Sequence, residues 1–463
     1  MSRPLTAAAS MTLLVGCATV NPRPAFDDMR KTVAERSRLD PEWSRTSEET
    51  SAAEEAVTKL LAAPLTVDAA VQIALLNNPT LQATFEEIGI SQADLAQAAR
   101  VENPEISGFV RFPSEGTGSN TEFSLVQNVF DIFLQPLRKK VAAAELEQTK
   151  LRVANEVLAL AGEVREAFFT LQARQQLVSR LTVIRDLTET AADFARKQYD
   201  AGTINELELE SRTVIHRESK VEVVVAEAEV RADRERLNRL LGLWGPRTVW
   251  SVEDRLPEIP DAEIPLAGLE RVAVTNRQDL QAARWGVDLV GRALALRRKT
   301  RFFPIGIHLG VNTEKDVGGE RVTGSEIALQ LPIFDTGKAS IARLDAEHRR
   351  AQRQLEALAV NARSEVREER DRMLAARDLA LYYGRVLLPQ RARILDLTLR
   401  HYNAMFKGAY DLLQAKEAEV EAEKAYLDSW RNYWIARARL ERALGGSLPA
   451  EPNVATAAGR EGR

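Results

Sequence analysis

The sequence lacks most of the features that would place it in a common class of protein. It has one cysteine and four histidines in 463 residues, and its 63 basic and 67 acidic residues nearly balance. This balance leaves no basic field to attract nucleic acid. A single cysteine excludes an intramolecular disulfide. No stretch approaches the roughly 18 consecutive apolar residues that a transmembrane helix needs, which excludes a helical inner-membrane protein.

Catalytic and metal-binding motifs are missing as well. There is no HExxH pair and no glycine-rich phosphate loop after a strand. Acidic pairs such as Glu163 and Glu166 alternate with arginine, as on a solvated helix face. The methionines Met29, Met373 and Met405 lie far apart in the chain, so soft metal ligands do not gather in the sequence. The sequence therefore predicts neither an enzyme nor a metal site, and no resident cofactor.

The one cysteine, Cys17, follows a short segment in which Arg3 precedes a mostly apolar run ending in Leu-Val-Gly. This arrangement resembles a bacterial lipoprotein signal, in which the cysteine thiol receives lipid. Residues 1–16 are then a signal peptide, and an ordinary signal with an incidental cysteine is the alternative. Acyl chains anchor firmly, since each buried CH₂ contributes about 0.8 kcal/mol. Ala18 after the cysteine implies export onward to the outer membrane.

What the chain does have is an internal duplication. The segment ALLNNPTLQA at 74–83 returns as AVTNRQDLQA at 273–282. A period of about 200 residues indicates a duplicated domain rather than a solenoid repeat. The expected boundaries are a signal peptide at 1–16, an extended N-terminal arm at 17–64, a first repeat at 65–245, an equatorial linker at 246–265, a second repeat at 266–446 and a tail at 447–463.

Each repeat contains a pair of segments in which apolar residues alternate with small or polar ones. The expected strands are 104–112 and 122–130 in the first repeat, and 303–312 and 322–333 in the second. Alternating segments of about ten residues suit a tilted transmembrane β-strand. A half-buried soluble hairpin is the alternative. Four strands cannot close a barrel, and edges left open in lipid are costly. Three copies supply twelve strands with room for a lumen, so we expect a homotrimer.

Long helical runs follow each strand pair. No proline occurs between Pro136 and Pro246, which predicts one helix over 138–201, about 95 Å long at 1.5 Å per residue. Its counterpart is expected at 337–403, and shorter return helices at 206–241 and 410–444. Apolar residues recur every seven positions in both long runs, as in laterally packed helices. These residues are Val157, Val164, Leu171 and Val178, and Ala359, Val366, Met373, Ala380 and Leu387.

Taken in order, these motifs resemble those of the TolC-like outer membrane factors. The resemblance rests on the duplicated Asn-containing region, the strand pairs, Leu331-Pro-Ile-Phe-Asp335 with Gly337, the turn from Tyr199 to Gly202, and the closing Leu440-Glu-Arg-Ala-Leu-Gly445. It covers residues 60–449. It implies a mainly α fold in which duplicated helical hairpins form a trimeric α-barrel of twelve helical columns, topped by a twelve-stranded transmembrane β-barrel with four strands per protomer. The segment Met405–Leu413 is more similar to the heavy-metal and copper-associated lipoprotein branch.

The resemblance also implies roles for particular residues. The turns at Tyr199 and Gly202, and at Met405 and Gly408, would be the tips that dock a periplasmic adaptor. Tyr402 and Lys407 would reach Glu208 in a closed periplasmic gate, and Asp411 would contribute to an acidic ring. A solvated helix surface is the alternative for these four residues, since exposed ion pairs contribute only about 0–1 kcal/mol each.

The function that follows is an outer membrane channel of a tripartite efflux pump, working with a periplasmic adaptor and an inner-membrane transporter. A type I secretion exit duct is an alternative within the same family. A lipid-anchored periplasmic coiled-coil scaffold without a pore is the alternative outside it. The sequence does not identify the transported substrate.

Overall fold

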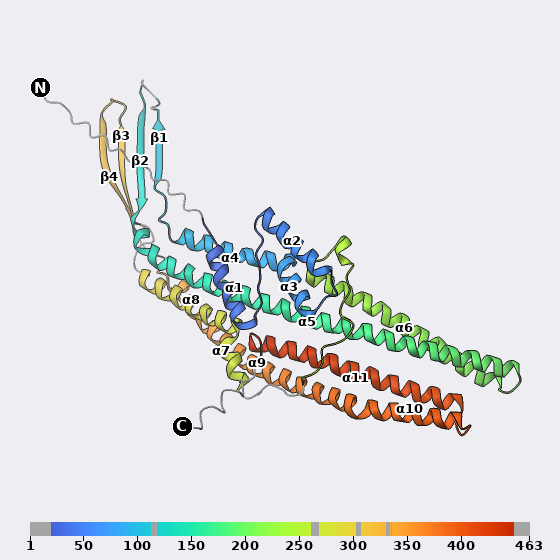
Figure 1. Ribbon diagram of the computed structural model, residues 1–463. Coiled ribbons are helices and arrows are strands. Elements are labelled where there is room, and N and C mark those ends of the chain that lie inside the picture. The colour runs from blue at the N-terminus through green and yellow to red at the C-terminus, as the bar shows by residue number, and fades with distance from the viewer. Residues whose placement is uncertain are drawn as a thin grey trace, which may run out of the picture.

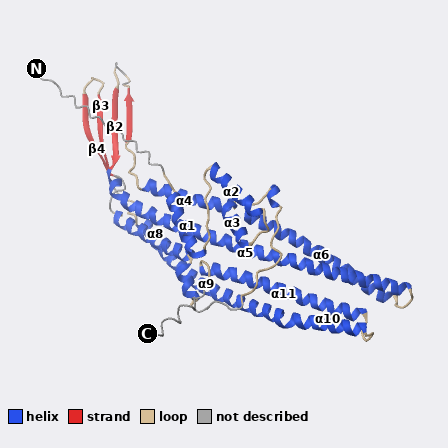
Figure 2. Cartoon of the chain, viewed as in Figure 1, coloured by secondary structure: helices blue, strands red, loops and turns tan. Residues whose placement is uncertain are grey.

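The computed structural model describes residues 20–112, 114, 118–260, 268–301, 307–329, 334 and 336–448. The described part is a long rod of helices with a single four-stranded sheet at one end (Figure 1). Figure 2 shows that every described strand lies at that end, while the opposite end consists of two helical hairpins. Cys17 and the expected signal peptide lie outside the described residues, as do Phe303, Ile305 and Leu331–Ile333.

The first repeat consists of two short helices, a hairpin of strands, a long helix and a return helix. Their bounds are α3 (Val67–Asn77), α4 (Pro79–Ala98), β1 (Glu105–Arg111), β2 (Asn120–Asn128), α5 (Val129–Asp200) and α6 (Glu206–Leu241). The second repeat has the same order. Its bounds are α7 (Leu269–Asn276), α8 (Gln278–Thr300), β3 (Ile307–Lys315), β4 (Arg321–Leu329), α9 (Lys338–Tyr382), the π-helical turn η2 (Tyr383–Leu387), α10 (Leu388–Asn403) and α11 (Ala409–Leu444).

The long helix α5 starts earlier than the predicted 138. It spans 72 residues from Val129 and continues through Pro136. Asn128 caps the new start by accepting from the amide of Asp131 at 3.3 Å. The buried Asp131 carboxylate then accepts from Arg138 at 2.9 Å, two residues beyond the proline. These two polar contacts stabilise the turns where the proline removes a backbone hydrogen bond.

The prediction of an extended arm at 17–64 is wrong. This segment contains α1 (Arg23–Ser37) and α2 (Ser47–Leu61). Phe26, Met29 and Val33 repeat at helical spacing and are buried in the main core. A capping box at Thr46 and Glu49 begins α2. The prediction failed because the polar composition of the segment hid one apolar stripe that packs on α5.

The described part of the equatorial linker begins with the short 3₁₀ helix η1 (Gly245–Thr248). We call its residues 250–260 the strap. Leu65 pairs with Val252 in a parallel bridge. Gln172 of α5 donates to the carbonyls of Glu253 and Arg255 at 2.8 and 2.7 Å. Trp430 and Trp434 of α11 both donate to the carbonyl of Pro257, at 2.7 and 2.8 Å. The strap therefore connects the first repeat to the second across the middle of the rod.

The duplication is visible in a joint at the end of each return helix. Gly242 and Gly445 end α6 and α11 with φ of +68° and +74°. Asn77 donates to the carbonyls of Leu241 and Gly242 at 2.9 and 2.8 Å, so the α6 end is held at the junction of α3 and α4. Gly445 lies against Arg277 at the equivalent junction of α7 and α8. The repeated sequence motif thus fixes the same helix–helix joint twice.

Candidate functional site

The two hairpin tips have the same backbone geometry. The amide of Gly202 donates to the carbonyl of Tyr199, and that of Met405 to the carbonyl of Tyr402, both at 2.9 Å. Gly202 has φ +71° and Met405 has φ +61°, the left-handed conformation that normally favours glycine. The expected second turn therefore places Met405, rather than Gly408, at the position equivalent to Gly202. The Met405 side chain is 93% exposed at the end of the rod.

The expected contact of Tyr402 and Lys407 with Glu208 is replaced, within one protomer, by local contacts. Lys407 Nζ donates to Asp411 Oδ1 at 2.9 Å, four residues along the same chain segment. Asp411 also accepts from the amide of Gly408 at 2.9 Å, which caps α11. The Lys407 hydrogen bond and then the Gly408 amide lower the pKa of Asp411. Glu208 Oε1 lies 4.0 Å from a guanidinium nitrogen of Arg212 on the same helix.

A tyrosine on the second hairpin joins the two hairpins instead. Tyr410, in the first turn of α11, donates its hydroxyl to Gln198 Oε1 of α5 at 3.1 Å. The guanidinium carbon of Arg212, from α6, lies 3.5 Å from the centre of the Tyr410 ring. One side chain therefore contacts both helices of the first hairpin. Burial raises the pKa of the nearby Glu417, and the charge of Arg212 partly opposes this shift.

An apolar groove of about 550 Å³ lies beside this contact. It is formed by α5, α10 and α11, and Tyr402 lines it together with Tyr410. The other lining side chains are mainly aliphatic, among them Val183, Leu187, Leu395, Leu399 and Leu413. Tyr402 is thus placed between the hairpins, whereas its expected partner Glu208 does not line this groove.

Farther from the tips, ion pairs hold α5 to α11. Arg165 pairs with Glu441 at 3.2 Å, Glu166 with Arg439 at 2.8 Å, and Arg180 with Glu423 at 3.2 Å. Burial raises the pKa of Glu441 against the opposing charges of Arg165 and Arg437. Phe169 and Trp434 also stack across this interface, with ring centres 5.6 Å apart. The hairpins are therefore joined more extensively near the strap than near the tips.

At the other end of the rod, the sheet has the order β1-β2-β3-β4 and is antiparallel throughout. Directly paired residues share a face. Ile106 pairs with Leu125, and Leu125 with Val311, so the predicted apolar sets of three strands lie on one face. Ile327 of β4 pairs with Leu309 on the same face. The alternation predicted from the sequence therefore gathers apolar residues of all four strands on one face. Polar residues also lie on this face, namely Thr121, Gln127, Thr313, Lys315, Arg321, Thr323 and Ser325.

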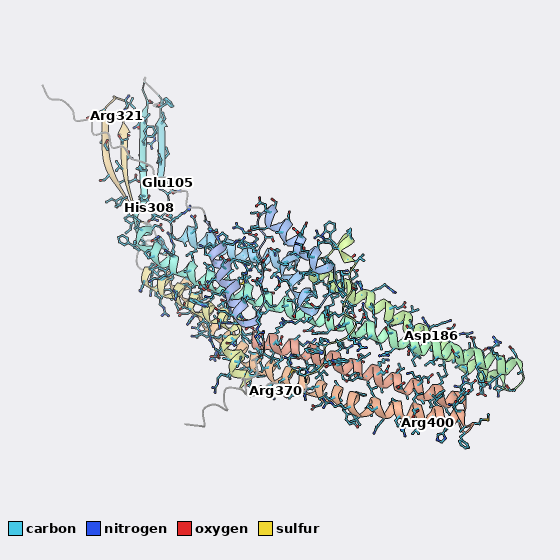
Figure 3. The ribbon with its side chains drawn as sticks, in the orientation of Figure 1. Glu105, Asp186, His308, Arg321, Arg370 and Arg400 are labelled. Carbon is cyan, nitrogen blue, oxygen red and sulfur yellow. The ribbon has the colours of Figure 1, made fainter. Side chains whose placement is uncertain are left out.

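The opposite face of the sheet is mainly polar. Ser107 and Ser124 are hydrogen-bonded across it at 2.8 Å, and Asn312 donates to Glu122 at 2.6 Å. The register adds further charged and polar members to this face, namely Glu105, His308, Glu314 and Glu326. The apolar exceptions on this face are Phe109, Val126, Val322 and Ala328. Figure 3 places Arg321 at the far end of the sheet and Glu105 and His308 at the end that meets the helices.

No group of three or more His, Cys, Asp or Glu side chains in the described part of the chain is arranged to hold a metal ion. None of the described helices is long and apolar enough to cross a membrane.

The chain is similar to known proteins over most of its length. Residues 270–446 match the family model described as outer membrane efflux protein. The cobalt-zinc-cadmium resistance protein CzcC of Cupriavidus metallidurans is 23% identical over 391 residues, which cover 83% of this chain and 91% of that protein. The chain is therefore similar to the outer membrane efflux proteins.

Solved structures share the fold of this chain. The Campylobacter jejuni CmeC outer membrane channel matches the efflux protein with a TM-score of 0.70 at 16% identity, covering 89% of this chain and 90% of that one. CusC matches with a TM-score of 0.68 at 17% identity, covering 82% and 92%. The family model covers the second repeat, and these structural matches extend the likeness across both repeats.

Sequence reasoning missed the residues that join the hairpins of the efflux protein. Tyr410, Gln198 and Arg212 come from three helices, and none belongs to a recognisable motif. The repeat itself offered one clue. Aligning the two tips places Tyr410 opposite Leu207, so an aromatic residue replaces an aliphatic one at the start of one return helix only.

Proposed function

We propose that three copies of this outer membrane efflux protein form one continuous channel, whose twelve strands cross the outer membrane and whose helices extend as a duct into the periplasm. The two-faced sheet carries this proposal. Its apolar face suits lipid, and its polar face suits a water-filled lumen. The sheet order leaves β1 and β4 at its two edges. Pairing of β1 with β4 of the next copy would remove both edges.

A matched pair of substitutions tests the orientation of the sheet. Val311 lies on the apolar face, and Gly324 lies on the polar face of the neighbouring strand, with no atom within 4 Å of an added Cβ. An arginine facing lipid near the middle of the membrane costs about 2–4 kcal/mol, whereas a lumen-facing one does not. We expect Val311→Arg to abolish the heat-sensitive trimer in outer membrane fractions and Gly324→Arg to retain it. Equal tolerance of both would refute the orientation.

The periplasmic end would be the regulated end. Tyr402, Lys407, Asp411 and Glu208 remain the proposed gate, which in a trimer would be built from contacts between copies as well as within them. Three Asp411 carboxylates around a threefold axis would favour cations. We expect Lys407→Ala combined with Tyr402→Phe to raise single-channel conductance in planar bilayers. Unchanged conductance from the folded trimer would refute this gate.

The tips at Tyr199, Gly202, Met405 and Gly408 would dock a periplasmic adaptor, and the adaptor would connect the duct to an inner-membrane transporter. The exposed Met405 and Phe406 side chains support this role, because exposed apolar residues at the end of a rod mark an interaction surface. Met405→Asp should weaken adaptor binding in a pull-down with the trimer, whereas a substitution at the equally exposed Val249, far from the tips, should not.

Lipid attachment at Cys17 is the remaining part of the proposal. It would hold the N-terminus in the inner leaflet of the outer membrane. Labelled palmitate should be incorporated into the wild-type chain and not into Cys17→Ser. The relative named for cobalt, zinc and cadmium resistance supports divalent cations as the cargo. Loss of this chain from its host should then raise sensitivity to those cations, and a type I secretion duct would instead lose an exported protein.

A further inference from the structure

Between two sequence motifs that both repeats share, the second long helical column has one residue more than the first. The motif Glu-Val-Arg-Glu at 163–166 returns at 365–368, 202 positions later, whereas Tyr199 returns as Tyr402, 203 positions later. One extra residue therefore lies between 368 and 402. The π-helical turn η2 (Tyr383–Leu387) falls in that interval. A π turn is how a helix accommodates a single inserted residue, and such turns commonly mark functional positions.

Packing of the column changes at this turn. Before it, the seven-residue repeat Val366, Met373 and Ala380 is buried against α11. The next member of the repeat, Leu387, is only partly buried, and α10 has no buried residue. Beyond the turn, Leu395, Leu399 and Tyr402 line the apolar groove against α5 and α11 instead of a closed core.

The equivalent part of α5 remains packed toward its tip. Leu181, Thr188 and Ala195 are all buried there. Thr188 is hydrogen-bonded to Ser219 of α6 at 2.8 Å. The two helices of the first hairpin are thus packed together far along toward their tip. Those of the second hairpin are packed mainly on the side of η2 that faces away from the tip.

Fixed contacts lie immediately above the turn. Arg377 donates to the carbonyl of Pro260 in the strap at 3.3 Å. Gly384, inside η2, packs so closely on Tyr426 that an added Cβ would lie 3.1 Å from Cε2 of that ring. Tyr426 in turn stacks on Trp430, which is bound to the strap. Pro389 follows the turn and lacks an amide to restore the helical hydrogen bonds.

We propose that η2 is the pivot about which the tip half of the second hairpin, α10 with the first turns of α11, swings against a fixed equator. This inference rests on the proposed channel function, since the swing would open the periplasmic end. Kinks at π turns are localised bends, so the motion needs no change in the helices on either side. The Tyr410 contact with Gln198 and Arg212 lies at the moving end and would break when the hairpin swings out.

Deletion of Val386 tests the pivot. The deletion makes the spacing from Glu368 to Tyr402 equal to that from Glu166 to Tyr199. The π turn should then become regular α-helix, while the tips keep their register. Val386→Ala is the matched control because it keeps the extra residue. Spin labels attached at Met405→Cys report tip-to-tip distances in the trimer. The chain without this substitution is labelled in parallel, so that any signal from label on Cys17 can be subtracted. We expect a broad distribution in the otherwise unmodified chain and in Val386→Ala, and a narrow one in the deletion.

Identical distributions in all three chains would overturn the pivot. If the deletion does not trimerise, hydrogen exchange on the wild-type trimer decides the question. Amides of 383–388 should then exchange at least about tenfold faster than those of the counterpart turn at 180–185, because local opening differs widely within one fold. Equal protection would overturn the pivot. Conductance of the same trimers is a separate readout: non-conducting trimers would refute the channel, whatever the distances show.

Discussion

The guanidinium carbon of Arg212 on α6 lies over the ring of Tyr410 on α11, 3.5 Å from its centre. Tyr410 also donates to Gln198 at 3.1 Å, so one ring ties the second hairpin to both helices of the first. A cation–π contact contributes about 0.5–1 kcal/mol at an exposed site, and a hydrogen bond about 0.5–1.5 kcal/mol. Both would be made three times in a trimer, which is enough to bias a closed state.

Tyr410→Phe removes the hydroxyl and keeps the ring over Arg212, whereas Tyr410→Leu removes both contacts. We expect conductance in planar bilayers to rise modestly in the first variant and further in the second. Leu207→Tyr, at the equivalent position of the first hairpin, is the control and should not raise it. Closed-state conductance that is identical in both Tyr410 variants and the wild type would contradict a locking role.

Glu417 should make this region sensitive to pH. Burial raises its pKa above the usual 4.5, so the folded protein holds the proton more tightly than the unfolded chain. Stability linked to this group is therefore fully present below pH 4.5 and is lost as the pH rises through the folded-state value. Glu417→Gln should raise the melting temperature at pH 7.5, and the gain should vanish below pH 4.5. A gain that is constant with pH would exclude ionisation as its cause.

Met405 occupies a backbone conformation that costs a side-chain-bearing residue about 1 kcal/mol relative to glycine. Met405→Gly should therefore raise the melting temperature of the trimer slightly, and Gly202→Met at the other tip should lower it. Adaptor binding should fall in Met405→Gly despite the gain in stability, because the exposed side chain is lost. A lower melting temperature for Met405→Gly would show that the turn is not strained.

Gly242 should be among the least replaceable residues of the first repeat. An added Cβ would lie 2.5 Å from the carbonyl oxygen of Asn77, at a φ of +68°. Gly268 has a similar φ of +79° but no atom within 4 Å, so it isolates the cost of the backbone conformation. We expect Gly268→Ala to cost about 1 kcal/mol and Gly242→Ala several times more, since the helix joint must separate. Thermal unfolding monitored by circular dichroism measures both, and equal losses would contradict the close packing.

Much of the fold could be predicted from the sequence because its signals are periodic and repeated. The return helix at 206–241 and the alternating faces of Val311 and Leu125 follow from local patterns that tertiary packing did not change. The helix containing Phe26 and Met29 was missed because its apolar stripe is short and lies in a polar segment. The contact of Arg212 with Tyr410 could not be predicted, since it joins residues almost 200 positions apart through helix packing alone.

The site residues divide in the same way. The turns at Tyr199, Gly202 and Met405 could be predicted because a tight turn imposes a local backbone rule, whereas their docking role stays a prediction. The expected partnership of Lys407 with Glu208 came from resemblance, and within one protomer Lys407 instead meets the nearer Asp411. The π turn left a trace in the sequence, because Glu368 and Tyr402 are one position farther apart than Glu166 and Tyr199. Only the structure shows where the extra residue is accommodated.

Reconstitution of the purified protein in planar lipid bilayers tests the central claim most directly, with the mass of the inserted particle measured in parallel. The account predicts discrete conductance steps from a particle of three chains, and no steps from Val311→Arg. A protein that stays monomeric in detergent and never conducts would contradict it.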